Sequence, residues 1–261
     1  MSPSTCPNCQ QEAMGAYCHH CGQKQGIQRL SWRYLFEDLQ QRLFGFDNNY
    51  LRTFRDLTIR PGKVVHTIIE GIRVKYVGPI GYYFLMLTIY LLLTSFLDID
   101  FSELAKPLVQ EADSEFEKNF QNSIFSTIFG NFRVTSFVMA PFFILGVWLL
   151  FRKKKYNFLE TSVLYFYSQG HIMILSIITV LIYYFSGSAE AMTYTLIPSI
   201  IYFGFVCASF YEGNAVWNFV KSLLGFLLGY IILLFVFLIG FIIYLFLNPE
   251  IVQQIQQESG G

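Results

Sequence analysis

The chain has 261 residues and a formal net charge of zero; 54% of its residues are hydrophobic and only 14% are charged. Soluble domains carry roughly 25% charged residues, so this composition excludes an ordinary soluble domain and indicates that lipid is the main solvent. The first long apolar run begins at Val77, which is too far along the chain for a secretory signal peptide.

Four of the five cysteines form two CxxC pairs near the N-terminus. Two such pairs match the ligand number and tetrahedral geometry of structural zinc, and four thiolates leave no position open for catalysis. The adjacent His19 and His20 are alternative ligands, but a complete set of cysteines makes them unnecessary. We therefore predict a zinc ribbon over residues 1–26, with one structural Zn²⁺ held by Cys6, Cys9, Cys18 and Cys21. Residues 1–26 contain one Lys and one Glu and so lack the basic character that nucleic-acid binding requires.

Residues 27–76 are predicted to form amphipathic helices at the cytoplasmic face of a membrane. Within 30–46, apolar residues recur at helical spacing, which fits either a helix in the membrane interface or one packed on a helical bundle. A turn at 47–49 then leads into a second helix that ends near Ile59. We expect a break over 60–63 and a short helix over 64–70.

Three motifs follow one another before residue 80. They are the CxxC pairs, a stretch from Tyr50-Leu51-Arg52-Thr53 to Arg60-Pro61-Gly62, and the pattern Gly71-x-Arg73-x-x-Tyr76-x-x-Pro79. With these motifs, residues 6–100 resemble a bacterial domain-of-unknown-function family of inner-membrane proteins with an N-terminal zinc ribbon. The resemblance implies a protein of the bacterial inner membrane and brings no activity with it. These motifs, and the position of segment 60–79 between the ribbon and the spans, identify seven candidate functional residues: Arg60, Pro61, Gly62, Gly71, Arg73, Tyr76 and Pro79.

Five apolar runs are long enough to cross a bilayer core as helices, which takes about 20 residues at 1.5 Å rise each. These runs are 77–97, 132–151, a span within 158–185, 191–210 and 222–247, with a polar link over 211–221. The predicted fold class is therefore an all-α polytopic membrane protein with about five transmembrane helices in 77–247. A flexible tail is expected over 248–261.

Basic residues indicate how the chain is oriented in the membrane. Ten of the 18 Lys and Arg lie in residues 1–76 and four more lie at 152–155, whereas 98–131 contains seven acidic residues and two Lys. Because basic loops stay in the cytoplasm, the N-terminus and 152–155 are expected inside. Five spans then place the C-terminus outside.

Few ionisable groups lie within the predicted spans. His171 is well inside a run, and such a residue is a candidate for function, although a lone His more often hydrogen-bonds to a neighbouring helix. Glu160 and Glu212 are expected to be solvated carboxylates near cytoplasmic ends. Gly225 and Gly229 permit close helix approach, for which we expect packing within the chain, with an oligomer as the alternative.

No catalytic motif accompanies these residues, so we predict that the protein is not an enzyme. The favoured function is a membrane adaptor, scaffold or regulator that presents the zinc ribbon to a cytoplasmic protein partner. The alternative is a transporter or channel for a small molecule or lipid, with a polar path through His171 and Gln169; against it, the spans lack paired charges. A lipid-modifying enzyme using His171 with Glu160 or Glu212 is a third hypothesis, for which no nucleophile is evident.

The segment 60–79 is expected to couple the ribbon to the spans. Pro61 and Gly62 define a turn, and Arg73 then lies at the cytoplasmic lipid surface. The simpler alternative is that the basic residues of this segment only orient the chain in the membrane.

Overall fold

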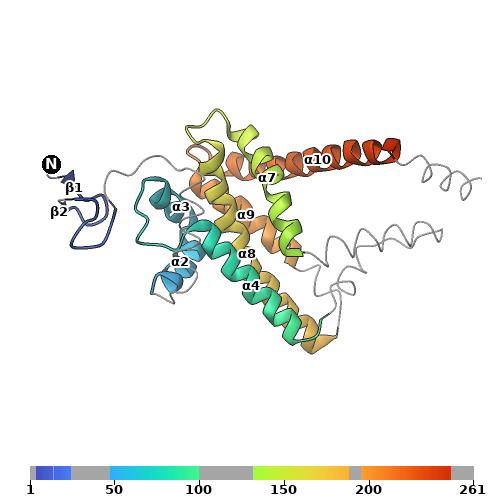
Figure 1. Cartoon of the computed structure of the whole chain (residues 1–261), viewed down its shortest axis with the longest axis horizontal. Helices are drawn as coiled ribbons and strands as arrows, with labels where there is room; N and C mark the ends of the chain where they lie inside the picture. The colour runs from blue at the N-terminus through green and yellow to red at the C-terminus, as the bar shows by residue number, and fades with distance from the viewer. Residues whose placement is uncertain (1–3, 14, 25–47, 100–131, 188–194, 248–261) are drawn as a thin grey trace, which may run out of the picture.

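The computed structural model describes residues 4–13, 15–24, 48–99, 132–187 and 195–247 (Figure 1). Apart from two strands of two residues each, the regular structure of these residues consists of seven helices. The helix predicted within 30–46, most of the acidic segment 98–131 and the tail 248–261 lie outside the described residues, so these remain predictions.

The N-terminal cysteines belong to a small ribbon beside the helical body. Strands β1 (Ser4–Thr5) and β2 (Glu12–Ala13) pair antiparallel, with Ser4 opposite Ala13. The ribbon lies at one end of the molecule, next to the two short helices α2 and α3 (Figure 1).

The helical body is built from two pairs of long helices with α9 between them. Helix α4 packs along α8, α7 packs along α10, and α9 contacts α3, α8 and α10. In Figure 1, α10 extends away from the end where the other helices meet. The helices are α2 (Asn48–Ile59), α3 (Pro61–Ile69), α4 (Pro79–Phe96), α7 (Phe132–Phe151), α8 (Phe158–Ser186), α9 (Leu196–Phe210) and α10 (Ala215–Leu247).

The two short helices share one buried core with the long ones. Leu57 of α2 and Ile68 of α3 are fully buried, in the same cluster as Tyr82 of α4, Leu164 of α8 and Phe210 of α9. Helices α2 and α3 are therefore part of the helical body, while the outer face of α2 remains exposed.

Among the described residues, three helices are long and apolar enough to cross a membrane: α4, α8 and the segment Ala215–Tyr244 of α10. The second and fourth predicted spans correspond to the shorter apolar helices Thr135–Phe151 and Leu196–Phe210. The structure thus confirms a helical protein with membrane-type helices, but not the count of five spans.

Two predicted boundaries are wrong. Helix α3 begins at Pro61 and not at residue 64, and the break is at Arg60, with φ −146°. Proline suits the first position of a helix because its φ is fixed near the helical value and the N–H that it lacks would not be bonded in the first turn. Helix α10 begins at Ala215 and not at 222. The side chain of Asn214 accepts a hydrogen bond from the Trp217 N–H (3.0 Å), so residues 215–221 form the first turns of the helix.

The paired glycines of α10 contact α7 of the same chain. A Cβ on Gly146 of α7 would lie 2.3 Å from the Gly225 carbonyl oxygen and 2.3 Å from the Gly229 nitrogen. This confirms the expected close packing within the chain.

Candidate functional site

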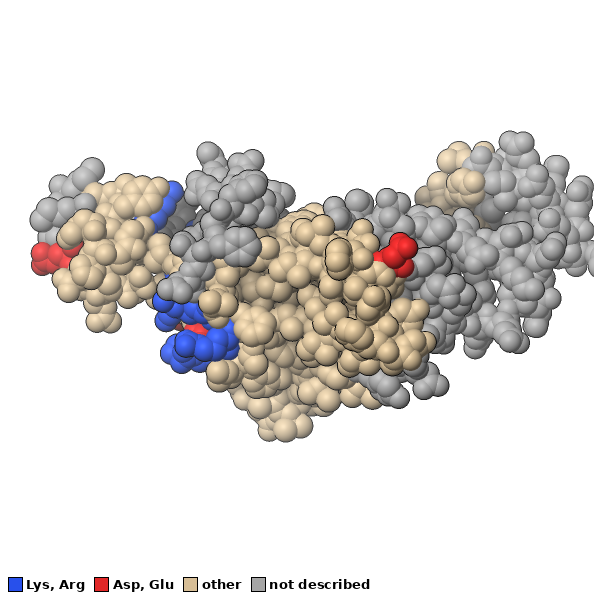
Figure 2. All heavy atoms as spheres, turned by 90° about the horizontal axis from the view of Figure 1, so that it is seen from below, with Lys and Arg blue, Asp and Glu red and all other residues tan. Residues whose placement is uncertain are grey.

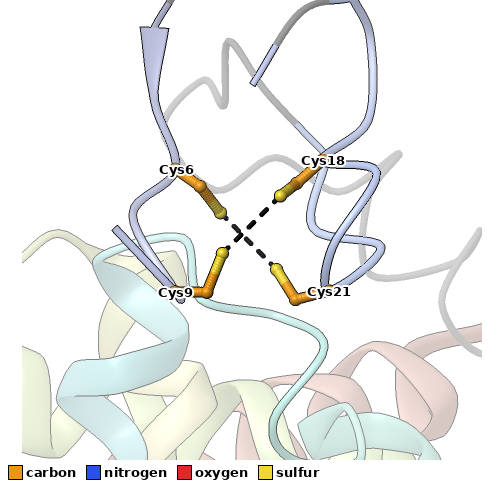
Figure 3. A group of neighbouring side chains, drawn as sticks. All are labelled: Cys6, Cys9, Cys18 and Cys21. Carbon is orange, nitrogen blue, oxygen red and sulfur yellow. Dashed lines mark hydrogen bonds between the residues drawn. The ribbon is translucent and has the colours of Figure 1, made fainter. Parts of the chain in front are cut away.

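The four N-terminal cysteines converge on one point (Figure 3). Their sulfur atoms all lie within 4.8 Å of one another, with 3.5 Å between Cys6 and Cys21 and 3.6 Å between Cys9 and Cys18. A metal ion with four sulfur ligands at about 2.3 Å would separate them by about 3.8 Å, so the group fits a tetrahedral thiolate site. His19 and His20 are exposed and do not belong to it.

The two CxxC loops have matching backbone conformations. The Cys6 N–H donates to the Gln11 carbonyl (2.9 Å), and the Cys18 N–H donates to the Gln23 carbonyl (2.8 Å). The residue after each second cysteine has a positive φ, 60° at Gln10 and 71° at Gly22. Gln11 and Gln23 therefore occupy equivalent positions in the two loops.

Backbone N–H groups of the first CxxC loop stabilise the thiolate form of Cys6, which is the form that binds metal. Burial by itself raises the pKa of Cys6, but the backbone N–H groups of Cys9 and Asn8, together with the neighbouring thiols, lower it to about 6.

Gln23 connects the ribbon to the segment between α3 and α4. Its buried side-chain amide donates to the Gly71 carbonyl (2.7 Å) and accepts from the Arg73 N–H (3.2 Å). Gly71 has φ 92°, a conformation that favours glycine. Because the carbonyl of Gln23 also closes the second CxxC loop, the metal site and residues 71–73 are joined through a single residue.

A buried carboxylate, that of Asp56, contacts the end of this segment through Tyr76. Asp56 of α2 accepts a hydrogen bond from the Tyr76 hydroxyl (2.8 Å) and is paired with Arg55 (3.0 Å) and Arg60 (3.3 Å). Burial by itself raises the pKa of Asp56, but hydrogen bonds from Tyr76 and Arg55 and the charge of Arg60 outweigh it, so the pKa lies below its ordinary value. Burial and the bond to Asp56 raise the pKa of Tyr76 to about 12.

Further hydrogen bonds connect α2 to the start of α4 and to α8. The hydroxyl of Thr53 donates to the Asn49 carbonyl (2.6 Å) and accepts from the Val77 N–H (3.0 Å). The Val77 carbonyl in turn accepts from the Tyr167 hydroxyl of α8. Tyr167 therefore lies level with the residues just before α4.

His171 lies about one helical turn further along α8, against the start of α4. The Thr58 hydroxyl donates to the Phe54 carbonyl (3.0 Å), so it accepts from His171 Nε2 (3.1 Å). The Tyr82 hydroxyl then donates to His171 Nδ1 (3.0 Å). This pattern fits a neutral imidazole with its proton on Nε2.

Aromatic rings enclose the same imidazole. The Tyr202 ring stacks on His171 with 5.0 Å between ring centroids, and the Phe54 ring lies 5.4 Å away. The Tyr202 hydroxyl donates to the Leu57 carbonyl (3.1 Å), which joins α9 to α2. His171 thus connects α8 to α2, α4 and α9, at the level where α4 begins.

A second histidine joins α3 to the end of α9. His66 Nε2 lies 3.0 Å from the Phe210 carbonyl oxygen, and His66 Nδ1 lies 3.3 Å from the Tyr156 hydroxyl. Gly62 makes this approach possible, since a Cβ there would lie 2.2 Å from the Ser209 carbonyl oxygen.

The two carboxylates that are expected near cytoplasmic ends, Glu160 and Glu212, behave differently. Glu160 is buried and was wrongly expected to be solvated: it accepts from the Asn157 N–H (2.8 Å), while the Asn157 side chain accepts from the Glu160 N–H (2.8 Å). This capping box begins α8. Glu212 is exposed, as expected, and pairs with Lys155 (2.7 Å), which lowers the pKa of Glu212.

The structure places most of the predicted candidates around α2, α3 and the start of α4. Arg60 and Tyr76 contact Asp56, and Gly71 and Arg73 contact Gln23. Pro61 and Gly62 begin α3, and Pro79 begins α4. His171 lies on the opposite side of α2. Sequence reasoning missed Gln23, Asp56 and His66. Asp56 carried a signal, since it lies between Thr53 and Leu57 on the buried side of α2.

Comparison with protein families finds one match in this region. Residues 47–91 match the family described as "Protein of unknown function (DUF3667)", and these residues comprise α2, α3 and most of α4. Comparisons with curated proteins and with solved structures give no significant match.

Proposed function

We propose that the protein is a non-enzymatic adaptor, scaffold or regulator of the bacterial inner membrane. It crosses the membrane five times, with the N-terminus in the cytoplasm and the C-terminus outside. A structural Zn²⁺ bound by Cys6, Cys9, Cys18 and Cys21 folds the ribbon, which binds a cytoplasmic protein partner.

The observation that carries this proposal is the contact of Gln23 with Gly71 and Arg73. A metal site bound by four thiolates has no open position for a substrate, which favours a structural role. The Gln23 amide holds the ribbon against the segment that leads through Tyr76 and Asp56 into the helical core. A partner bound to the ribbon is therefore connected to the membrane helices through these hydrogen bonds.

The proposed orientation agrees with the contacts between distant basic segments. Tyr156 follows the basic residues 152–155 and contacts His66 of the N-terminal segment. The two regions that are expected inside thus lie at the same end of the helical body, as the positive-inside rule requires.

The transport alternative receives less support. Thr58, Tyr82 and the aromatic rings surround His171, and its two ring nitrogens are both within hydrogen-bonding distance of a hydroxyl. Within the described part of α8, Thr179 is the next buried polar residue toward Ser186, about 12 Å further along the helix axis. Along α8, the buried polar side chains therefore do not form a continuous row.

Native purification tests the proposal. The full chain is purified in mild detergent, its zinc content is measured, and the proteins that co-purify are identified. One zinc per chain is expected, together with a protein partner. The double variant Cys9→Ser, Cys18→Ser should lose both the metal and the partner but still insert in the membrane.

The fifth cysteine provides a matched control, since Cys207 is buried in α9 and is not part of the metal group. A Cys207→Ser variant should keep the metal and the partner. Retention of a full zinc equivalent by the double variant would refute the ligand assignment. Retention of every co-purifying protein after loss of the metal would refute the adaptor role of the ribbon.

A further inference from the structure

The outer face of α2 combines arginines with large apolar side chains. Leu51, Phe54 and Ile59 are 73%, 42% and 65% exposed, and the Arg55 side chain is 62% exposed. Arg52 is exposed as well. At about 100° of rotation per residue, these five residues occupy one continuous arc of the helix.

The two edges of this arc differ in polarity. Phe54 is at one edge, and its ring lies 5.4 Å from the His171 ring of α8. Arg52 is at the other edge, with Arg55 and Ile59 between them on the helix surface. The apolar edge therefore lies beside α8 at the level where α4 begins, and Arg52 lies at the opposite edge of the arc.

We propose that this face of α2 binds the headgroups of anionic phospholipids. Leu51 and Phe54 would enter the boundary of the acyl chains, and Arg52 and Arg55 would bind the phosphates. Figure 2 shows basic side chains gathered over this end of the helical body, beside a surface without charge. The proposal rests on the membrane placement proposed above but is independent of the partner of the ribbon.

Arg55 is already oriented for this role. Its Nε and one of its terminal nitrogens lie 3.1 and 3.0 Å from Asp56 Oδ1, which fixes the planar guanidinium while most of the side chain stays exposed. The N–H groups that do not face Asp56 are left for a second acceptor, and phosphate oxygens match the geometry of a guanidinium. A bilayer surface suits this face better than a protein because α2 lies beside the start of a membrane-type helix.

Lipid titration of the full chain in mild detergent tests the proposal, with bound lipid counted by native mass spectrometry. Phosphatidylglycerol is the anionic probe and phosphatidylcholine the neutral one. A basic residue near an anionic surface strengthens binding about fivefold, so Arg52→Gln with Arg55→Gln should weaken phosphatidylglycerol binding about thirtyfold. Binding of phosphatidylcholine should not change. Zinc content and the partner of the ribbon should also be unaffected, which separates this test from that of the adaptor.

The turn after α7 supplies a matched control pair. Arg152 and Lys153 are exposed, but the flanking Phe151 and Tyr156 are buried, so this turn has charge without an apolar anchor. Arg152→Gln with Lys153→Gln should change phosphatidylglycerol binding less than threefold. Equal losses in both pairs would overturn the proposal, because binding would then follow charge alone.

Two further results would also overturn it. Full competition by inorganic phosphate would assign the arginines to a free anion and not to a lipid. A photo-crosslinker at position 51 that yields a protein adduct in cells would assign the face to a protein. If the double variant does not fold, Arg52→Gln alone should still give a fivefold loss, since Arg52 does not contact Asp56; an unchanged affinity would refute the site.

Discussion

Replacing Gln23 with alanine separates the metal site from its connection to the helical core. The substitution removes the donor to the Gly71 carbonyl, in a buried contact, and the acceptor for the Arg73 N–H, in a partly buried one. A buried backbone group left without its partner costs about 1–3 kcal/mol. The carbonyl of Gln23 that closes the second CxxC loop is not affected, so the Gln23→Ala variant should still bind a full equivalent of metal.

Hydrogen exchange followed by mass spectrometry reports directly on this contact. In the metal-loaded full chain, the Arg73 amide of the Gln23→Ala variant should exchange about 5- to 150-fold faster, the factor that 1–3 kcal/mol represents. Amides in the middle of α8 should exchange at unchanged rates, because α8 has its own contacts with α4.

Gln11 provides the control, since it has the equivalent position in the first CxxC loop and its side chain is exposed. A Gln11→Ala variant should leave exchange at residues 71–73 unchanged. If Gln23→Ala and Gln11→Ala give the same protection at Arg73, the ribbon is not held by this amide, and the inferred connection to the core is wrong.

The other predictions concern topology, Arg73 and acid stability. Reporter fusions after Gly26, Glu111, Lys155 and Gln257 should report inside, outside, inside and outside, in that order. An inside signal from the fusion after Gln257 would exclude five spans. Arg73→Lys keeps the charge but not the planar guanidinium, so this variant should insert normally and impair cellular function. Coupling through Arg73 would be refuted if Arg73→Lys gave a normal phenotype and Arg73→Glu only prevented correct insertion. The lowered pKa of Asp56 means that its stabilising contribution is present above about pH 4 and is lost as the pH falls through the lowered value. Thermal unfolding between pH 3 and 7 should therefore show a flatter acid limb for Asp56→Asn, at lower overall stability; an unchanged acid limb would contradict the role of Asp56.

The sequence predicted the features that depend on spacing and on hydropathy. The CxxC pairs identified the four cysteines that lie close enough to hold a metal ion, because a short loop brings two thiols together whatever surrounds it. Helix α7 has the bounds that its apolar run predicted, residues 132–151. The boundaries failed where polarity and secondary structure diverge, as at Asn214, whose side chain begins a helix within a polar segment.

The contacts of the polar residues could not be predicted in the same way. Glu160 lies near an expected cytoplasmic end, and sequence position alone suggests a solvated carboxylate; the structure buries it because Asn157 supplies the reciprocal half of a capping box. Gln23 contacts Gly71 and Arg73, which are about 50 residues away in the chain, and no local pattern relates them to Gln23. His171 was identified as an ionisable side chain within an apolar run, but its partner Thr58 lies 113 residues away in the chain.

The residues that match the family model, 47–91, contain several buried polar contacts. Most of the large hydrophobic residues of α10 are exposed, and an exposed apolar surface of this kind accepts many different large apolar side chains. A buried polar group accepts very few substitutes, since its partner is left unsatisfied if it changes. Asp56 with Tyr76, Thr53 with Val77, and Tyr82 with His171 each join two separate segments in this way, and each pair has at least one member in 47–91. The residues that match the family model thus include buried hydrogen bonds that join α2 to the start of α4 and α4 to α8.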